Sequence, residues 1–320
     1  MLSSKAHIYI IGAGAIGKAL AVFLGRAGKN VTLIRGSIHE GPRKYEDISI
    51  KMPDGTAQRS RMEITTLDNL SMINGIIVLA NKSFGNGQLA VSLKAKTGNS
   101  PIVLLQNGLG IEEPFMRLEY PEIYRSVLFV TGQAIDPCTV RFKPVDICPV
   151  GIERGNQRNL DTIVDQLNTT DFKFKSELHI QQVIWKKTII NCVFNSVCPL
   201  LEVDNGIFQR NAEALKIARN VISECIAIAS AKGIELDADE VESSLMQISR
   251  LSAGQEISTL QDIRNKKRTE IGTLNLEIAR IAETLNKMDL VPQTSLLGKL
   301  TKLKADINMS IYKGTENMRS

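Results

Sequence analysis

The chain has 320 residues, of which 43% are hydrophobic and 23% charged, so it is long enough for two domains with separate cores. Its formal net charge of +5 is mild, and acidic residues are interspersed among the basic ones, which argues against nucleic-acid binding and suits a small anionic ligand. Apolar runs are too short for a membrane span and no signal peptide is recognisable, so we expect a cytoplasmic protein.

Cysteine and histidine usage bears on metal binding. The five cysteines form no CxxC pair, and the chain has only three histidines. We therefore expect reduced core thiols and no metal site. The cysteines are Cys138, Cys148, Cys192, Cys198 and Cys225.

The first predicted elements are a strand at residues 7–11, a glycine-rich turn, a helix that stops at Gly28 and a strand at residues 30–34. This order is the context in which a GxGxxG motif indicates dinucleotide binding. Gly12 permits the tight turn, Gly14 lets a pyrophosphate approach the backbone, and Gly17 lets the helix pack on the sheet. The candidate cofactor loop comprises Gly12, Ala13, Gly14, Ala15, Ile16 and Gly17.

The next segments are a predicted hairpin, 47–52 with 58–63, and two apolar runs at 76–80 and 102–106 that are typical of buried parallel strands. Ligands bind at the carboxyl ends of such strands, so Lys82 and Asn107 are candidate binding residues. Each is also compatible with an ordinary polar loop.

Arg35, at the end of the second strand, bears on the choice of cofactor. NAD-specific folds generally have a carboxylate there for the ribose hydroxyls, whereas an Arg offers a donor fork to a 2′-phosphate. The sequence therefore favours NADP(H), with an exposed loop Arg as the alternative.

From about residue 178 onward, helical patterns replace strands, at roughly 181–198, 207–232, 237–249, 255–285 with breaks, and 293–312. The expected fold class is α/β, with a Rossmann-type dinucleotide-binding domain at 1–177 and an all-α domain at 178–320. We expect a tight join near residues 173–179.

Lys187, Asn191 and Asn195 recur every four residues in an apolar helical segment. This spacing puts an ammonium and two amides on one helix face, and a buried Lys needs a ligand or partner. The stripe is our candidate active site. A polar network that fixes the register of two helices would also explain it.

Taken together, these motifs resemble the ketopantoate reductase (2-dehydropantoate 2-reductase) family over nearly the full length. The resemblance depends on the glycine loop, Arg35, Lys82, the segment around Asn107, the stripe at Lys187, and Ser258 followed by Glu270. It implies NADPH-dependent reduction of 2-oxopantoate to (R)-pantoate in coenzyme A biosynthesis, with Lys187 rather than Lys186 as the general acid.

The resemblance also implies roles for other residues. Arg35 and Lys82 would hold the 2′-phosphate, and Asn107 would contact both nicotinamide and substrate. Glu270 would lie near both, holding Lys187, a substrate hydroxyl or the cofactor. The implied substrate binders are Asn107, Lys187, Asn191, Asn195, Asn205 and Ser258.

Two positions depart from the family pattern: Gln133, where many relatives have His, and Gln255, where an Asn often precedes the Ser. Both bear on which 2-oxo acid fits. A paralogous reductase of another 2-oxo acid therefore stays open as an alternative. A nonenzymatic NADP-binding regulator with a decayed site is a further alternative, against which the intact set of Lys, Asn, Ser and Glu residues argues. The late Ser258 and Glu270 motif disfavours 3-hydroxyacid dehydrogenases. The helical half offers surfaces for a homodimer.

Overall fold

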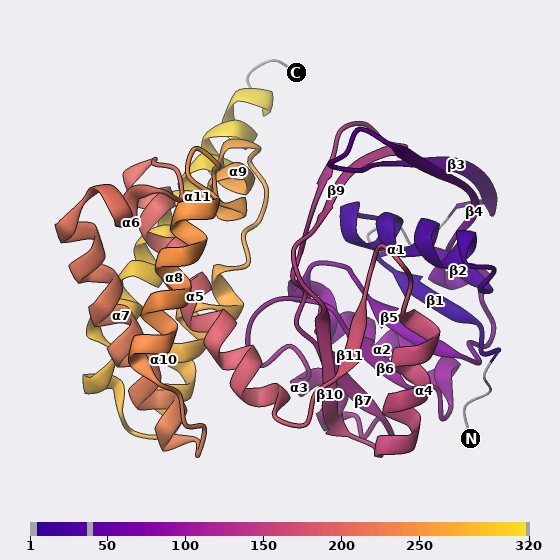
Figure 1. Ribbon diagram of the computed structural model, residues 1–320, viewed down its shortest axis with the longest axis horizontal. Helices are drawn as coiled ribbons and strands as arrows, with labels where there is room; N and C mark the ends of the chain where they lie inside the picture. Colours follow the sequence, from indigo (N-terminus) through magenta and orange to yellow (C-terminus); the bar gives the residue numbers. More distant parts are fainter. Residues whose placement is uncertain (1–4, 37–40, 318–320) are drawn as a thin grey trace. The chain divides into compact units, whose positions relative to one another are not determined.

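The computed structural model describes residues 5–36 and 41–317, with side chains described through residue 310. The chain divides into two compact units. Unit 1 holds residues 1–107 and 111–180, and unit 2 holds residues 108–110 and 181–320. Figure 1 shows the strands in unit 1 and the helices α5 to α11 in unit 2.

The described strands of unit 1 form an eleven-stranded sheet in the order β11-β10-β7-β6-β5-β1-β2-β4-β3-β9-β8. The six neighbouring strands from β7 to β4 are mutually parallel. Their order, outward from β1 in both directions, is that of a doubly wound Rossmann sheet, as the sequence predicted. The strands are β1 (Ile8–Ile11), β2 (Val31–Arg35), β3 (Lys44–Lys51), β4 (Ala57–Thr66), β5 (Ile76–Leu79), β6 (Ile102–Leu104), β7 (Ile123–Ser126), β8 (Val130–Ala134), β9 (Thr139–Pro144), β10 (Cys148–Arg154) and β11 (Phe174–Ser176).

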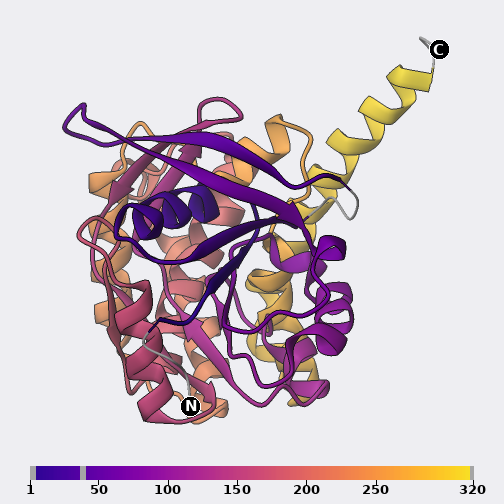
Figure 2. The same ribbon diagram turned by 90° about the vertical axis from the view of Figure 1, so that its right-hand side faces the viewer.

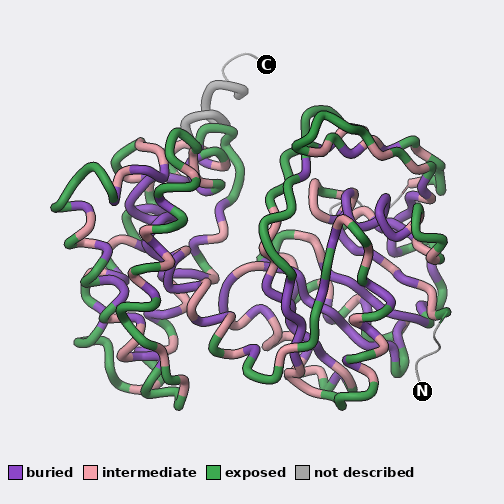
Figure 3. Tube along the Cα trace, in the orientation of Figure 1, coloured by how far each residue is buried: buried purple, intermediate pink, exposed green. Residues whose placement is uncertain are grey.

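Helices cover both faces of this sheet. Successive side chains of a strand point to opposite faces, so each central strand contributes to two cores. Ile8 and Ile10 of β1 belong to the core that contains α1 (Ala15–Arg26) and α4 (Gln157–Leu167). Ile11 belongs to the core that contains α2 (Asn86–Thr97) and α3 (Glu113–Arg117). Figure 3 shows the central strands buried and the outer hairpins largely exposed.

The outer strands were only partly predicted. The hairpin of β3 and β4 is confirmed. In contrast, the segment expected to join the two domains forms β11, which pairs with β10. β8 lies against α1, since a Cβ on Gly132 would be 3.0 Å from Ile16 Cδ1, and Lys18 Nζ of α1 donates to the Pro137 carbonyl at 2.5 Å.

Unit 2 is helical, and its described residues contain no strand. The helical stretch at 255–285 was predicted with breaks, and the structure has them. α9 ends at Arg264, Lys266 has a left-handed φ of 55°, and a 3-10 turn, η3 (Ile271–Thr273), precedes α10. The helices are α5 (Ile180–Leu201), α6 (Ile207–Arg210), α7 (Ala212–Ala231), α8 (Ala238–Leu251), α9 (Ser258–Arg264), α10 (Asn275–Thr284) and α11 (Pro292–Asn317). Among the described residues, no helix is long and apolar enough to cross a membrane.

Four of the five cysteines are buried, as predicted, but Cys138 is partly exposed between β8 and β9. The expectation of a core position for Cys138 is therefore wrong. Burial raises the pKa of Cys198 to about 12 and also raises the pKa of Cys192. Because the reactive form of a thiol is the thiolate, these two buried cysteines are poor nucleophiles.

Candidate active site

The glycine loop of unit 1 follows β1 and is shaped by close backbone contacts. Gly12 has a φ of +118°, and a Cβ there would lie 2.4 Å from the backbone nitrogen of Asn81. A Cβ on Gly17 would lie 1.9 Å from the Gly12 carbonyl oxygen, so neither position admits a side chain. Gly14 is exposed, and a Cβ there would have no neighbour within 4 Å. The loop is thus tight at its two ends and open in the middle, where a pyrophosphate would approach.

The ends of β2 and β5 flank this loop, because both strands pair in parallel with β1. Arg35 ends β2, and its Nε and Nη2 atoms are buried without a hydrogen-bond partner among the residues that the structure describes. Asn81 follows β5, and its buried Oδ1 also lacks a partner within the described part of the chain. Lys82 is exposed beside it. Buried N–H groups rarely stay unsatisfied, so the Arg35 guanidinium suits an anionic group of a ligand, whereas the Asn81 oxygen suits a hydrogen-bond donor.

A buried amide pair supports the loops after β5 and β6. Asn86 Nδ2 donates to Gln106 Oε1, and Gln106 Nε2 donates back to Asn86 Oδ1, both at 2.8 Å. Gln106 Nε2 also donates to the Asn81 carbonyl, and Asn86 Nδ2 to the Ile111 carbonyl. The backbone is therefore fixed directly before Asn107 and again at Ile111. Sequence reasoning missed this pair, whose only signal is two amides near the ends of neighbouring strands.

The three residues between these anchors, 108–110, belong to unit 2. Leu109 N–H donates to the Thr273 carbonyl at 2.9 Å, and a Cβ on Gly108 would lie 2.4 Å from Thr273 Oγ1. Thr273 in turn donates its N–H and its hydroxyl to the Glu270 carbonyl. The loop that follows Asn107 thus packs on the turn that begins at Glu270. Glu270 is half-buried, whereas residues 264–268 are exposed.

The stripe predicted from four-residue spacing lies on α5, where its burial increases along the helix. Lys187 and Asn191 are half-buried, and Asn195 is 4% exposed, so the expectation of uniform burial is only partly correct. The neighbouring Lys186 Nζ is 2.5 Å from Glu240 Oε1 of α8. The helical register therefore directs the two lysines differently, and Lys186 has a structural ion pair.

Asn195 joins α5 to the start of α9. Its Oδ1 accepts a hydrogen bond from Thr259 Oγ1 at 2.7 Å and a longer one from Ser258 Oγ at 3.5 Å. Its Nδ2 donates to the Asn191 carbonyl at 3.1 Å. Because the oxygen is held by a hydroxyl donor, the amide orientation is fixed, and within the described part of the chain the second N–H of Nδ2 is available to an acceptor. Sequence reasoning identified Ser258 and missed Thr259, the shorter contact.

Asn205 lies beside the same segment of the chain. Its N–H donates to the Gln255 carbonyl at 3.0 Å, its carbonyl accepts from Ser249 Oγ at 2.7 Å, and its buried Oδ1 has no partner among the described side chains and backbone groups. Residues 255–259 therefore contact both Asn205 and Asn195. The other departure from the family pattern, Gln133, is exposed in unit 1 and accepts from Arg141 at 3.1 Å.

Asp204 fixes the turn that carries Asn205. Its carboxylate accepts from Arg210 Nη2 at 2.9 Å and from the Gly206 N–H at 2.6 Å. These hydrogen bonds to the charged form lower the pKa of Asp204 to about 2. The carboxylate is therefore ionised at neutral pH.

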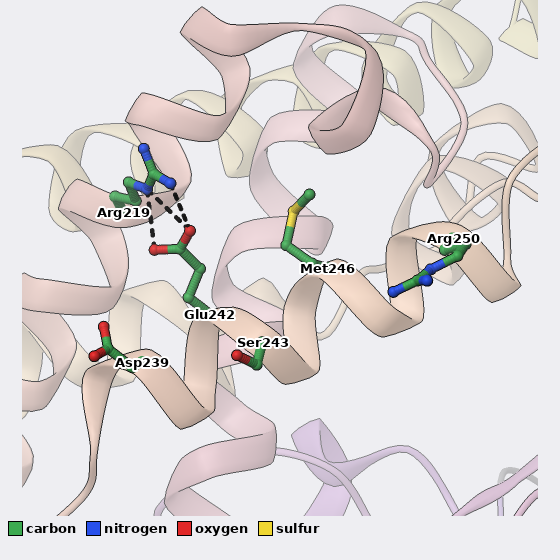
Figure 4. A pocket seen from close by; sticks show the side chains of 6 residues that line it. All are labelled: Arg219, Asp239, Glu242, Ser243, Met246 and Arg250. Atoms are coloured by element: carbon green, nitrogen blue, oxygen red, sulfur yellow. Dashed lines mark hydrogen bonds and ion pairs between the residues drawn. The ribbon is translucent and has the colours of Figure 1, made fainter.

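A separate hollow of about 640 Å³ lies at the surface of α7 and α8. Figure 4 shows that Arg219 and Glu242, which line it, face each other, and Arg219 Nη2 is 2.7 Å from Glu242 Oε1. The Arg219 hydrogen bonds lower the pKa of Glu242. None of the predicted site residues lines this hollow. Its lining comprises Arg219, Asp239, Glu242, Ser243, Met246 and Arg250.

Comparison with known proteins identifies the family. The family model described as "Ketopantoate reductase PanE/ApbA" matches residues 8–151, and "Ketopantoate reductase PanE/ApbA C terminal" matches residues 179–304. A 2-dehydropantoate 2-reductase of Pyrococcus horikoshii is 30% identical over 94% of this chain and 98% of its own length. The chain belongs to the ketopantoate reductase family, which is a family of oxidoreductases.

Solved structures share the fold. A ternary structure of D-mandelate dehydrogenase with NADH and anilino(oxo)acetate superposes with a TM-score of 0.80 at 20% identity, covering 94% of this chain and 99% of that one. A dimeric ketopantoate reductase from Staphylococcus aureus superposes with a TM-score of 0.79 at 20% identity, with the same coverage. At 20% identity, these similarities show that the chains share a fold. The substrate and the cofactor depend on the side chains of this chain.

Proposed function

We propose that this chain reduces a 2-oxo acid to the 2-hydroxy acid with NADPH, and that ketopantoate is its substrate. The observation that carries the proposal is the family match across both units, which extends over 94% of the chain. The relatives named 2-dehydropantoate 2-reductase supply the reaction.

The choice of NADPH is supported by the unsatisfied guanidinium of Arg35 at the end of β2. A 2′-phosphate would accept from its Nε and Nη2 atoms, and Lys82 would add a second positive charge. The open backbone at Gly14 would receive the pyrophosphate. Arg35 takes the place of the carboxylate that an NAD-specific site would use, so we expect NADPH to be preferred over NADH.

In the proposed mechanism, Lys187 acts on the substrate carbonyl. When bound, the reduced nicotinamide would supply the hydride that the carbonyl carbon accepts. The Lys187 ammonium polarises the carbonyl oxygen and gives it a proton, so that the alkoxide never carries full charge, and solvent then reprotonates the amine. The products are the 2-hydroxy acid and the oxidised cofactor.

The amides would bind the rest of the substrate. The remaining N–H of Asn195 suits an acceptor such as the substrate carboxylate, because Thr259 already occupies Oδ1. The unsatisfied Oδ1 of Asn205 suits a donor, which ketopantoate offers in its hydroxyl group. Asn107, Asn191 and Ser258 complete the proposed set, and Glu270 would position Lys187, the substrate hydroxyl or the cofactor.

A reductase of another 2-oxo acid is the second candidate, because Gln133 and Gln255 depart from the family pattern. The test is NADPH and NADH oxidation by the purified chain with ketopantoate beside a panel of 2-oxo acids. We expect the highest kcat/KM with ketopantoate and NADPH. A higher value with another acid would select the second candidate. Binding of NADPH without turnover of any acid would indicate a nonenzymatic regulator instead.

A further inference from the structure

Asn81, directly after β5, is held firmly by the groups around it. Its carbonyl accepts a hydrogen bond from Gln106 Nε2 at 2.9 Å, and the N–H of the preceding Ala80 donates to the Ile11 carbonyl of β1 at 2.8 Å. The side-chain Nδ2 of Asn81 donates to the Lys82 carbonyl at 3.0 Å. Because only the nitrogen of an amide can donate to a carbonyl, this hydrogen bond fixes the amide orientation and directs Oδ1 away from the Lys82 carbonyl.

The Oδ1 atom of Asn81 is a buried acceptor that no group of the described residues satisfies. A buried oxygen without a donor costs free energy, so such atoms usually have a partner. Two glycines lie against Asn81: a Cβ on Gly36 would be 3.2 Å from Asn81 Cβ, and a Cβ on Gly12 would be 2.8 Å from Asn81 Cα. Neither glycine has a side chain that reaches Oδ1, so the donor has to come from water or from a ligand.

This acceptor lies between the two phosphate sites of the proposed cofactor. β1, β2 and β5 are parallel neighbours, so their carboxyl ends meet at one edge of the sheet, and Figure 2 shows α1 in indigo and α2 in purple on opposite sides of these strands. Gly12 begins the glycine loop, which would receive the pyrophosphate, and Gly36 follows Arg35, which would hold the 2′-phosphate. Asn81 lies against both glycines. The part of NADPH that joins these two phosphates is the adenosine ribose.

We propose that Asn81 Oδ1 accepts a hydrogen bond from the 3′-hydroxyl of the adenosine ribose. The ribose of NADPH carries the pyrophosphate at its 5′ oxygen and a phosphate at its 2′ oxygen, so the 3′-hydroxyl is its only donor. NAD-specific sites meet ribose hydroxyls with a carboxylate. The neutral amide of Asn81 accepts from the hydroxyl without repelling the phosphate beside it. The inference rests on the cofactor site of the proposed function and adds a contact to a group that NADPH and NADH share.

Cofactor titrations of Asn81→Leu test the proposal, because leucine has a similar size and no acceptor. Loss of one neutral hydrogen bond should raise the dissociation constants of NADPH and NADH alike, by about three- to tenfold. Arg35→Ala, by contrast, should affect mainly NADPH. The control Asn99→Leu makes the same substitution at an exposed position before the amino end of β6, on the opposite edge of the sheet, and should bind both cofactors like the wild type. Circular dichroism checks that each variant is folded.

Two cofactor analogues identify the donor. The wild type should bind the 3′-deoxy analogue of NADPH about three- to tenfold more weakly than NADPH, whereas Asn81→Leu should bind the two equally. The hypoxanthine analogue of NADPH lacks the adenine amino group, and the wild type should still bind it more tightly than Asn81→Leu does. If that difference vanishes instead, Oδ1 accepts from the adenine and the proposal is overturned. A wild type that binds both cofactors beside an Asn81→Leu variant of equal affinity would refute only this inference. A wild type that binds neither cofactor would refute the proposed function and the inference together.

Discussion

At the scale of single residues, helical register separates two adjacent lysines. Lys186 forms an ion pair with Glu240, whereas Lys187 shares its four-residue phase with Asn191 and Asn195. The sequence could predict this choice because periodicity alone determines which residues share a face. It could not predict the contact from Thr259 to Asn195, since that hydrogen bond depends on how α9 packs against α5.

Arg35 is predicted to select the phosphorylated cofactor. Arg35→Ala should weaken NADPH binding by about 10- to 100-fold, the usual effect of losing hydrogen bonds to a charged group, and NADH binding by no more than about twofold. Arg43→Ala, which removes an exposed Arg paired with Glu63, is the matched control and should change neither affinity. Fluorescence titration measures the affinity for each cofactor. Equal losses of affinity for NADPH and NADH would refute the role of Arg35.

Thr259 is predicted to position Asn195. Thr259→Val keeps the side-chain shape and removes the hydroxyl that holds Oδ1, so the amide can rotate. We expect the KM for the 2-oxo acid to rise about fivefold, as for one lost hydrogen bond, with NADPH affinity unchanged. Thr259→Ser should restore the KM because it restores the donor. An unchanged KM in the Val variant would contradict this role.

At the scale of elements, the central strands follow from continuous apolar runs and the helices of unit 2 from apolar periodicity, whereas the outer strands of the sheet follow from neither. β11 has three residues, and only its pairing with β10 makes it a strand. The segment at residues 108–110 could not be assigned to unit 2 from sequence either, because its packing on Thr273 joins residues more than 160 positions apart.

That segment should tolerate no side chain. Gly108→Ala combines a left-handed φ of +96° with a clash against Thr273, so we expect the free energy of unfolding to fall by about 2–5 kcal/mol. Gly233→Ala is the control, because Gly233 has a φ of +76° but open space around its Cβ position. Its cost should be about 1 kcal/mol. Urea unfolding measures the free energy of unfolding of both variants. Equal decreases in the two variants would show that the contact with Thr273 is unimportant.

At the scale of the whole molecule, the stability of the fold should depend on pH through His7. Burial lowers the pKa of His7 below 6.5, and the nearby Glu63 opposes this shift without cancelling it. The folded state therefore binds fewer protons than the unfolded state as pH falls below 6.5, and stability is lost until the folded-state pKa is passed. His7→Gln should flatten the dependence of Tm on pH in this interval. Parallel curves for the variant and the wild type would contradict the prediction.

The fold class was predictable because short, continuous apolar runs indicate the buried parallel strands of the first half, whereas a hydrophobic period of 3.6 residues indicates the helices of the second half. The functional assignment was less accessible, since Asn195 and Asn205 contact residues 255–259 only in the folded chain, about 50 to 60 positions away along the sequence. The resemblance to the family implies the roles of these residues, and the structure shows the hydrogen bonds that substitutions can remove.

Single-turnover oxidation of bound NADPH by ketopantoate, compared between Lys187→Ala and Lys186→Ala, tests the central claim most directly. If Lys187 donates the proton, its variant should bind NADPH normally and turn over at least about 100-fold more slowly, as expected for the loss of a general acid. The Lys186 variant should react at nearly the wild-type rate, because that lysine serves the ion pair with Glu240. A Lys187 variant that reacts as fast as the wild type would contradict the account.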